Sequence, residues 1–131
     1  MPVIAEKVFA LLAAGKNAFI DSDAFLLKNR FLFCLKEKPL PPKELCDILK
    51  QDKSNLAHVA AGLEKSGLIV KRIIAADKRR VRYELSETGR ETLDTVLQAA
   101  EAKFLNFLDS PAAYAEAEEK LESVIRLFSF L

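Results

Sequence analysis

The sequence predicts a mainly α-helical fold with one small β-hairpin, because its hydrophobic period changes twice along the chain. Apolar residues recur at helical spacing up to residue 66 and again after residue 86. Between these regions two short segments on either side of 75–78 have the composition of strands, and the second of them alternates apolar and polar residues. Several of the expected boundaries carry a proline or a glycine, the residues that most often interrupt regular structure. We therefore expect four helices, a hairpin and two further helices, in that order.

The first two expected helices lie before residue 36. Helical spacing predicts the first over 3–20, and its apolar side consists of Ile4, Val8, Leu11, Leu12, Gly15 and Phe19. The second follows an N-cap at Asp21 or Ser22, because short polar side chains satisfy the free N–H groups of a first turn. Its expected apolar side consists of Phe25, Leu32 and Leu35. Prolines within 36–42 end it, since proline cannot continue a helix.

Two short helices follow. Pro42 suits the first turn of a third helix over 42–50, since a first turn needs no hydrogen bond from that nitrogen. Asp52 is expected to cap a fourth helix over 53–66, and Gly67 to end it in a left-handed conformation. The residues expected to face the core are Leu45, Ile48 and Leu49 in the third helix and Leu56, Val59, Ala60 and Leu63 in the fourth.

The rest of the chain is expected to form a hairpin and two longer helices. The strands are predicted at 68–74 and 80–85, with alternate residues of the second strand facing the core. Ser86 is expected to cap a helix over 87–108, and the segment 109–111 to separate it from a last helix. The expected apolar residues are Val81, Tyr83 and Leu85 in the strand, Leu93, Val96, Leu97, Ala100, Phe104 and Phe107 or Leu108 in the first helix, and Ala113, Ala117, Leu121, Val124, Ile125 and Phe128 in the second.

A pair of short helices followed directly by a hairpin is typical of a helix-turn-helix with a wing. The predicted fold class is therefore a winged helix-turn-helix, with the N- and C-terminal helices as an α-helical dimerisation region. The net charge is only +1, but residues 71–82 carry six Lys or Arg residues against one Asp. Such a cluster is a local footprint for a polyanion, so we expect double-stranded DNA as a partner. A solvated hairpin is the alternative interpretation of the cluster.

The fourth helix supplies the candidate DNA contacts. Asn55 and His58 lie off its apolar stripe, near its N-terminal half. Asparagine can hydrogen-bond the N6 and N7 atoms of adenine together, and histidine can donate to a base edge or a phosphate. Lys53 and Ser54 are better suited to phosphate, which a helix N-terminus already favours. The alternative is that Asn55 and His58 are merely solvated.

Motif-like segments lie between about residues 41 and 90: Lys53-Ser54-Asn55-Leu56, Gly62-Leu63-Glu64-Lys65-Ser66-Gly67-Leu68-Ile69, Arg72, Asp77-Lys78-Arg79 and Leu85-Ser86-Glu87-Thr88-Gly89-Arg90. Together they resemble the MarR family of regulators. The family pattern combines a Leu-Glu-x-x-Gly-Leu-Ile/Val turn, an Asp-Arg-Arg wing, and Leu-Thr-x-x-Gly after five further residues. Here five residues, 80–84, separate Arg79 from Leu85.

The resemblance implies a single MarR-like domain over 1–131, with a DNA-binding part at 22–87 and a dimerisation part at 1–20 and 88–131. It also implies a homodimer on pseudo-palindromic DNA, which usually represses transcription and is released by a small aromatic ligand or an oxidant. The sequence departs from the family where Pro41 replaces a Ser/Thr N-cap and Ala57-His58 replaces a Thr-Arg pair. The chain is also short, which leaves less room for a ligand pocket.

The expected wing contains the remaining candidate contacts, Asp77, Lys78, Arg79 and Arg80. In the functional interpretation Asp77 orients an arginine that enters the minor groove, with Arg79 favoured for this role over Arg80. The alternative is a loop salt bridge of little energetic weight.

Other functional classes find little support. No nucleophile–base set, glycine-rich phosphate loop or paired-carboxylate motif stands out, so we expect neither an enzyme nor a cofactor. His58 is the single histidine, and no metal-ligand spacing exists. Cys34 and Cys46 are expected to be small buried hydrophobic residues of a reduced, cytoplasmic protein rather than redox sensors. No apolar run approaches the roughly 20 residues that span a bilayer, so no membrane is expected.

One alternative from another class stays open. A winged helix can bind a protein through the same surface and never contact DNA. The low net charge and the composition of residues 91–131, with 3 Lys or Arg and 8 Asp or Glu, are compatible with that function. The basic hairpin and the polar, non-acidic face of the fourth helix favour DNA. A thiol sensor would be a mechanism within the DNA-binding hypothesis.

Overall fold

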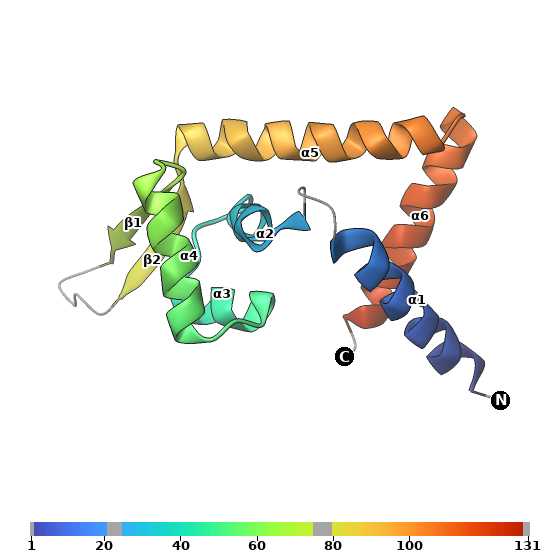
Figure 1. The fold of residues 1–131 in the computed structure, drawn as a ribbon, viewed down its shortest axis with the longest axis horizontal. Helices are drawn as coiled ribbons and strands as arrows, with labels where there is room; N and C mark the ends of the chain where they lie inside the picture. The colour runs from blue at the N-terminus through green and yellow to red at the C-terminus, as the bar shows by residue number, and fades with distance from the viewer. Residues whose placement is uncertain (1, 21–24, 75–79, 130–131) are drawn as a thin grey trace. The chain divides into compact units, whose positions relative to one another are not determined.

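The computed structural model describes residues 2–20, 25–74 and 80–129. They fall into two compact units, Met1–Val96 and Leu97–Leu131, of which each is described by itself. The element order is the expected one (Figure 1). The elements are α1 (Val3–Ile20), α2 (Leu27–Cys34), α3 (Pro42–Leu49), α4 (Lys53–Lys65), β1 (Ile69–Ile73), β2 (Val81–Leu85), α5 (Glu87–Phe107) and α6 (Pro111–Phe128).

Helix α1 has the predicted bounds, but α2 begins later than expected. The N-cap of α2 is Leu26, whose extended backbone (ψ 152°) precedes the first helical residue and whose side chain makes no capping hydrogen bond. Asp21 and Ser22, expected as N-caps, lie outside the described residues and several positions before this start. Polar capping residues in the sequence therefore did not locate this helix end, because α2 starts without a side-chain cap.

Helices α3 and α4 form the predicted helix pair. Pro42 occupies the first turn of α3. Pro41 is the N-cap, and it makes no capping hydrogen bond because the proline side chain has no polar atom. Leu45 and Leu49 are buried, four residues apart on one face. Ile48 was expected to face the core, but 57% of it is exposed. A helix this short buries only the narrow stripe that touches its neighbours, and Ile48 lies beside that stripe.

The two ends of α4 are capped as predicted. Asp52 is the N-cap and accepts a hydrogen bond from the Asn55 backbone N–H at 2.7 Å. At the other end Gly67 has a φ of 75°, a conformation that only glycine adopts without strain. The backbone N–H of Leu68 then donates to the carbonyl of Leu63 at 3.0 Å, and that of Gly67 to the carbonyl of Glu64 at 2.9 Å. This pattern turns the chain from α4 directly into β1.

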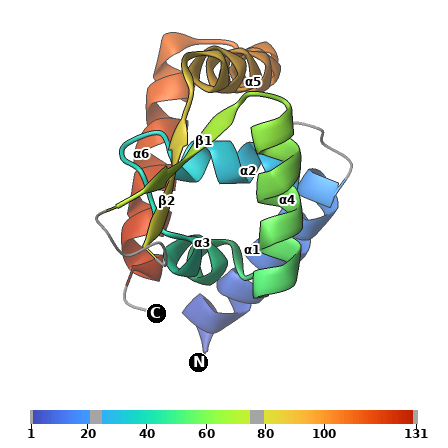
Figure 2. The same ribbon diagram turned by 90° about the vertical axis from the view of Figure 1, so that its left-hand side faces the viewer.

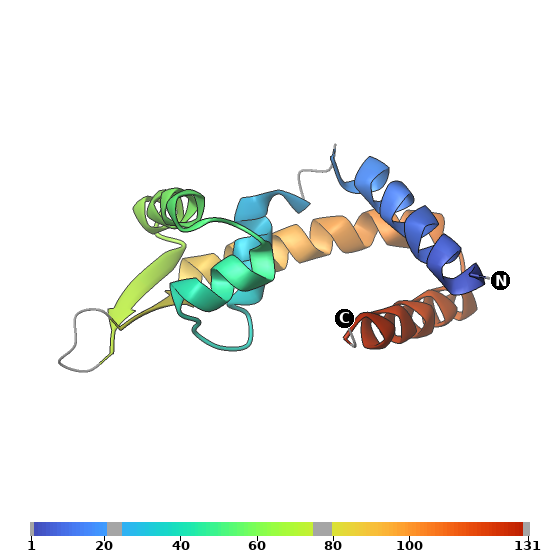
Figure 3. The same ribbon diagram turned by 90° about the horizontal axis from the view of Figure 1, so that it is seen from below.

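The hairpin closes the core of the first unit. Strands β1 and β2 form the hairpin seen in Figure 3. They are antiparallel, with Ile69 opposite Leu85 and Ile73 opposite Val81. Tyr83 of β2 also forms a bridge with Leu40, and its ring meets Phe31 edge-on at a centroid distance of 5.9 Å. The core consists of Phe31, Leu32, Leu35, Leu40, Leu45, Leu49, Leu56, Ala60, Leu63, Ile69, Tyr83, Leu85 and Leu93. Val59, expected in this core, is half-buried.

Helix α5 starts against the hairpin. The Ser86 hydroxyl accepts from the Gly89 backbone N–H at 2.9 Å and donates to the Gly67 carbonyl at 2.6 Å, which confirms Ser86 as the cap. Gly89 is buried against the backbone of Leu68: a Cβ built on Gly89 would lie 1.9 Å from the Leu68 carbonyl oxygen. The glycine of the Leu-Ser-x-x-Gly segment is therefore required by a close approach of α5 to the chain before β1.

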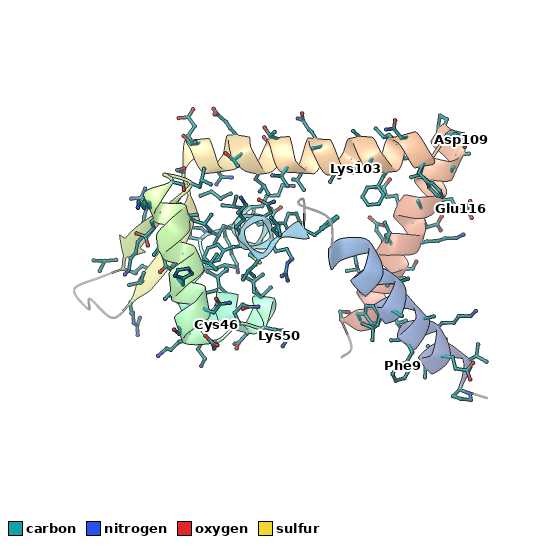
Figure 4. All side chains as sticks on the ribbon, viewed as in Figure 1. Phe9, Cys46, Lys50, Lys103, Asp109 and Glu116 are labelled. Atoms are coloured by element: carbon teal, nitrogen blue, oxygen red, sulfur yellow. The ribbon has the colours of Figure 1, made fainter. Side chains whose placement is uncertain are left out.

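The outer helices carry apolar side chains that nothing in their own unit buries. In α6 no residue is buried, although its apolar side chains recur at helical spacing and Ser110 caps it at Ala113 N–H. In α1 the exposed fraction of Phe9 reaches 74% (Figure 4). Exposed large apolar residues of these regions are Val3, Ile4, Phe9, Leu11 and Leu12 in α1, Phe104, Leu105 and Phe107 in α5, and Tyr114, Leu121, Ile125 and Leu127 in α6. None of the described helices has the length and apolarity that crossing a bilayer requires.

Candidate nucleic-acid interface

The outward face of α4 contains four of the sequence-predicted contact residues. Lys53, Ser54, Asn55 and His58 are all exposed, whereas Leu56, Ala60 and Leu63 point into the core. The remaining exposed positions of this helix include Ala57, Ala61 and Gly62, whose small side chains leave the helix backbone accessible. A face with a polar N-terminal half and little bulk matches what a helix needs in order to enter the major groove.

The core holds this face in place from behind. Helix α4 contacts α2, α3 and β1, and α3 contacts β2 (Figure 2). Between α3 and α4 the chain turns at Lys50, which is labelled in Figure 4. Lys50 adopts a left-handed conformation with a φ of 54°. The N–H groups of Lys50 and Gln51 both point to the Cys46 carbonyl, so the end of α3 is closed by the turn itself. The turn places Lys50 beside the N-terminus of α4.

A residue that the sequence interpretation missed lies in this turn. The Gln51 side chain is half-buried; its Nε2 donates to the Leu49 carbonyl at 3.2 Å, and its Oε1 accepts from Nδ2 of Asn55. Gln51 precedes the N-cap, and no helical pattern singles it out. The four-residue spacing of two amide side chains across a helix start is the only signal in the sequence that could have suggested it.

The hairpin presents basic side chains beside α4. On the outer face of the strands Arg72 lies directly opposite Arg82, and Arg72 forms an ion pair with Glu84 at 2.5 Å. Arg80 is exposed, and its carbonyl accepts from the Ile74 N–H at 2.8 Å, which closes the strand pair. Asp77, Lys78 and Arg79 lie outside the described residues, so their predicted roles rest on the sequence.

The two cysteines are both free and half-buried, and so less enclosed than expected. Burial raises the pKa of the Cys34 thiol, and the lowering effect of Arg30 does not compensate for it. Cys34 therefore has little of the thiolate form that a redox sensor needs near neutral pH. Among the described residues no group of three or more His, Cys, Asp or Glu side chains could hold a metal ion.

The second unit contains an open cleft of about 640 Å³ where α5 ends and α6 begins. Glu101 lies in it with Tyr114, and the Glu101 carboxylate raises the pKa of the Tyr114 hydroxyl by accepting its hydrogen bond. Two carboxylates in a mainly apolar lining disfavour an anionic occupant. The lining residues are Glu101, Leu105, Leu108, Asp109, Ser110, Pro111 and Tyr114.

Solved structures resemble this arrangement, whereas no protein-family model and no curated protein matches the chain. The transcriptional regulator BldR from Sulfolobus solfataricus aligns over 100% of both chains, with 20% identity and a TM-score of 0.73. A MarR-like transcriptional regulator from Thermotoga maritima aligns over 98% of this chain and 97% of its own, with 23% identity and a TM-score of 0.59. For AbsC, a MarR family transcriptional regulator from Streptomyces coelicolor, the aligned shares are 79% and 74%, with 23% identity and a TM-score of 0.56. The chain has the winged helix fold of MarR-type transcriptional regulators, which confirms the predicted winged helix-turn-helix.

Proposed function

We propose that this chain is a sequence-specific, DNA-binding transcriptional regulator rather than an enzyme. The observation that carries the proposal is the outward face of α4, where Lys53, Ser54, Asn55 and His58 are exposed together on a helix braced by α3. The similarity to transcriptional regulators in fold supports it. A regulator of this kind acts where the chromosome is, so the proposal includes the cytoplasm. We assign Asn55 and His58 to base edges or phosphate, and Lys53 and Ser54 to phosphate.

The proposed active form is a homodimer, with residues 22–87 as the DNA-binding part and residues 1–20 and 88–131 as the dimerisation part. The exposed apolar side chains of α1, α5 and α6 support this, because a second copy is the simplest surface that would cover them. Two recognition helices related by a two-fold axis read half-sites about 10–10.5 base pairs apart, centre to centre. Binding over a promoter would repress transcription.

Selection of bound sequences from a random DNA pool tests the proposal directly. We expect a pseudo-palindromic site, and we expect Asn55→Ala to weaken binding to it by about 1–3 kcal/mol with relaxed preference at one position in each half-site. The matched control is Asn106→Ala, which removes an exposed asparagine from α5 and should change neither quantity, provided that light scattering shows the variant to be a dimer like the unmodified chain. Failure to select any sequence would reject DNA reading and favour the alternative, a winged-helix module that binds another protein.

Lys53 gives a second test with a different signature. If Lys53 neutralises one phosphate, Lys53→Ala weakens binding to specific and random DNA alike, and the slope of log affinity against log salt falls by about 1. Sequence preference should stay as in the unmodified protein. A change of preference without a change of slope would contradict the assignment of Lys53 to phosphate.

The wing and the ligand complete the proposal. We assign Asp77, Lys78, Arg79 and Arg80 to the hairpin's contact with DNA, with Arg79 in the minor groove and Asp77 orienting it.

A small aromatic ligand would release the protein from DNA. If it binds the cleft beside Tyr114, the carboxylates there require it to be neutral or cationic. Titration of the DNA complex with matched aromatic amines and aromatic acids tests this, and release by the acids alone would place the site elsewhere.

A further inference from the structure

Asn55 is held by a chain of hydrogen bonds that begins at the protein backbone. The Leu49 carbonyl can only accept, so the Gln51 side chain must present its Nε2 there, and it does so at 3.2 Å. This leaves Oε1 of Gln51 as the group that faces Asn55. Because that oxygen can only accept, Asn55 must turn its Nδ2 toward it, as observed. The backbone carbonyl thus fixes the orientation of both amides.

This orientation leaves free the two groups of the Asn55 amide that the recognition of adenine needs. An amide nitrogen has two hydrogens, of which Gln51 takes one, so one N–H and the Oδ1 oxygen stay available on the exposed side of α4. The major-groove edge of adenine offers the N7 acceptor next to the N6 donor, which these two groups match. A reversed amide would place its oxygen toward Gln51 and lose this hydrogen bond.

We propose that Gln51 is a positioning residue that fixes the Asn55 amide for one adenine in each half-site. This inference rests on the proposed function and adds to it the base that Asn55 reads and the residue that orients it. Gln51 gains this role because its side chain is half-buried against the turn, whereas a fully exposed amide would rotate freely in water. A side chain held in its binding orientation loses less conformational freedom when the complex forms.

The fold itself has little need of the Gln51–Asn55 pair. Gln51 lies before the N-cap of α4, so its side-chain hydrogen bond with Asn55 is not one of the backbone hydrogen bonds that hold the helix. The N-terminus of α4 is already capped by Asp52, whose carboxylate accepts from the Asn55 backbone N–H at 2.7 Å. Loss of the Gln51 amide should therefore leave the thermal unfolding transition nearly unchanged, which separates a positioning role from a structural one.

The test uses Gln51→Met in the full chain, because methionine keeps the length of the side chain and removes both polar ends. We expect about a three- to tenfold loss of affinity for the selected site and a weaker preference for adenine at the position that Asn55→Ala affects. Affinity for random DNA should not change. Gln98→Met, an exposed substitution of the same kind in α5, is the matched control.

A double-mutant comparison decides the mechanism. If Gln51 acts through Asn55, Gln51→Met should have no further effect on affinity or preference when Asn55 is already alanine. Full additivity of the two changes, unchanged adenine preference in Gln51→Met, or an equal loss on random DNA would each overturn the inference. These outcomes leave the proposed function intact as long as the unmodified chain selects a site, whereas selection of no site would reject both.

Discussion

The winged-helix part and the last helix use similar apolar patterns with opposite results. In residues 27–93 the apolar stripes of the helices and of β2 meet one another, and thirteen residues from Phe31 to Leu93 form a hydrophobic core. In α6 the stripe is just as regular, yet none of its residues is buried. Periodicity therefore predicts that a helix has an apolar face, but the neighbouring elements decide whether the single chain can cover it.

The largest expected effect concerns the exposed apolar face of α6. Leu121 and Ile125 lie four residues apart on α6, and 63% and 68% of them are exposed. Replacing both by glutamate in a dimer interface would remove about 3–6 kcal/mol of association free energy, since each buried apolar side chain contributes about 1.5–3 kcal/mol. We expect the double variant to be a monomer by light scattering at micromolar concentration, with unchanged helical content.

Ser123→Glu is the matched control, because it adds a charge to an exposed polar position of the same helix. It should stay dimeric. A dimeric Leu121→Glu/Ile125→Glu variant would mean that α6 is not part of the interface, and that its apolar face needs another explanation.

The second effect concerns the packed region, where Gly89 tests how closely the elements meet. A Cβ at Gly89 would lie 1.9 Å from the Leu68 carbonyl oxygen and 3.3 Å from Cδ2 of Leu85. The first contact is with backbone, and the same Leu68 carbonyl accepts the Ser86 backbone N–H at 3.0 Å, so it cannot move aside without disturbing that hydrogen bond. We expect Gly89→Ala to lower the free energy of unfolding by about 3 kcal/mol, measured by urea denaturation. Wild-type stability of this variant would show that α5 can shift freely against β1.

The same comparison explains which features the sequence predicted. The starts of α3, α4 and α5 carry Pro42, Asp52 and Ser86, and Gly67 follows the end of α4; the local chemistry of these residues is independent of distant residues, and these predictions are confirmed. The start of α2 has no such residue, and the predicted N-cap at Asp21 or Ser22 was wrong. The prediction that Ile48 faces the core was wrong, because burial on a short helix depends on which neighbouring elements contact it.

One part of the candidate site could be predicted from the sequence and another part could not. The exposed face of α4 followed from its periodicity, because Leu56, Ala60 and Leu63 define the buried side and leave Lys53, Ser54, Asn55 and His58 outside. The Gln51 contact with Asn55 depends on the left-handed turn at Lys50. Lysine is not a residue type that favours such a turn, so the sequence contained no local indication of it.

The smallest effect is expected at Gly62, an exposed glycine inside the packed unit. A Cβ at Gly62 would have no atom within 4 Å, so packing gives no reason for a glycine in this helix. Gly62→Ala should raise the free energy of unfolding by about 0.5–1 kcal/mol, because alanine loses less backbone freedom in a helix. Ala61→Gly, on the neighbouring exposed position, should lower the free energy of unfolding by a similar amount.

Base contacts in a helix-turn-helix come from the N-terminal residues of the second helix, so we expect DNA affinity to stay unchanged in Gly62→Ala. Stabilisation combined with weaker DNA binding would instead show that the C-terminal half of α4 also approaches the DNA, and that Gly62 is kept small for that contact.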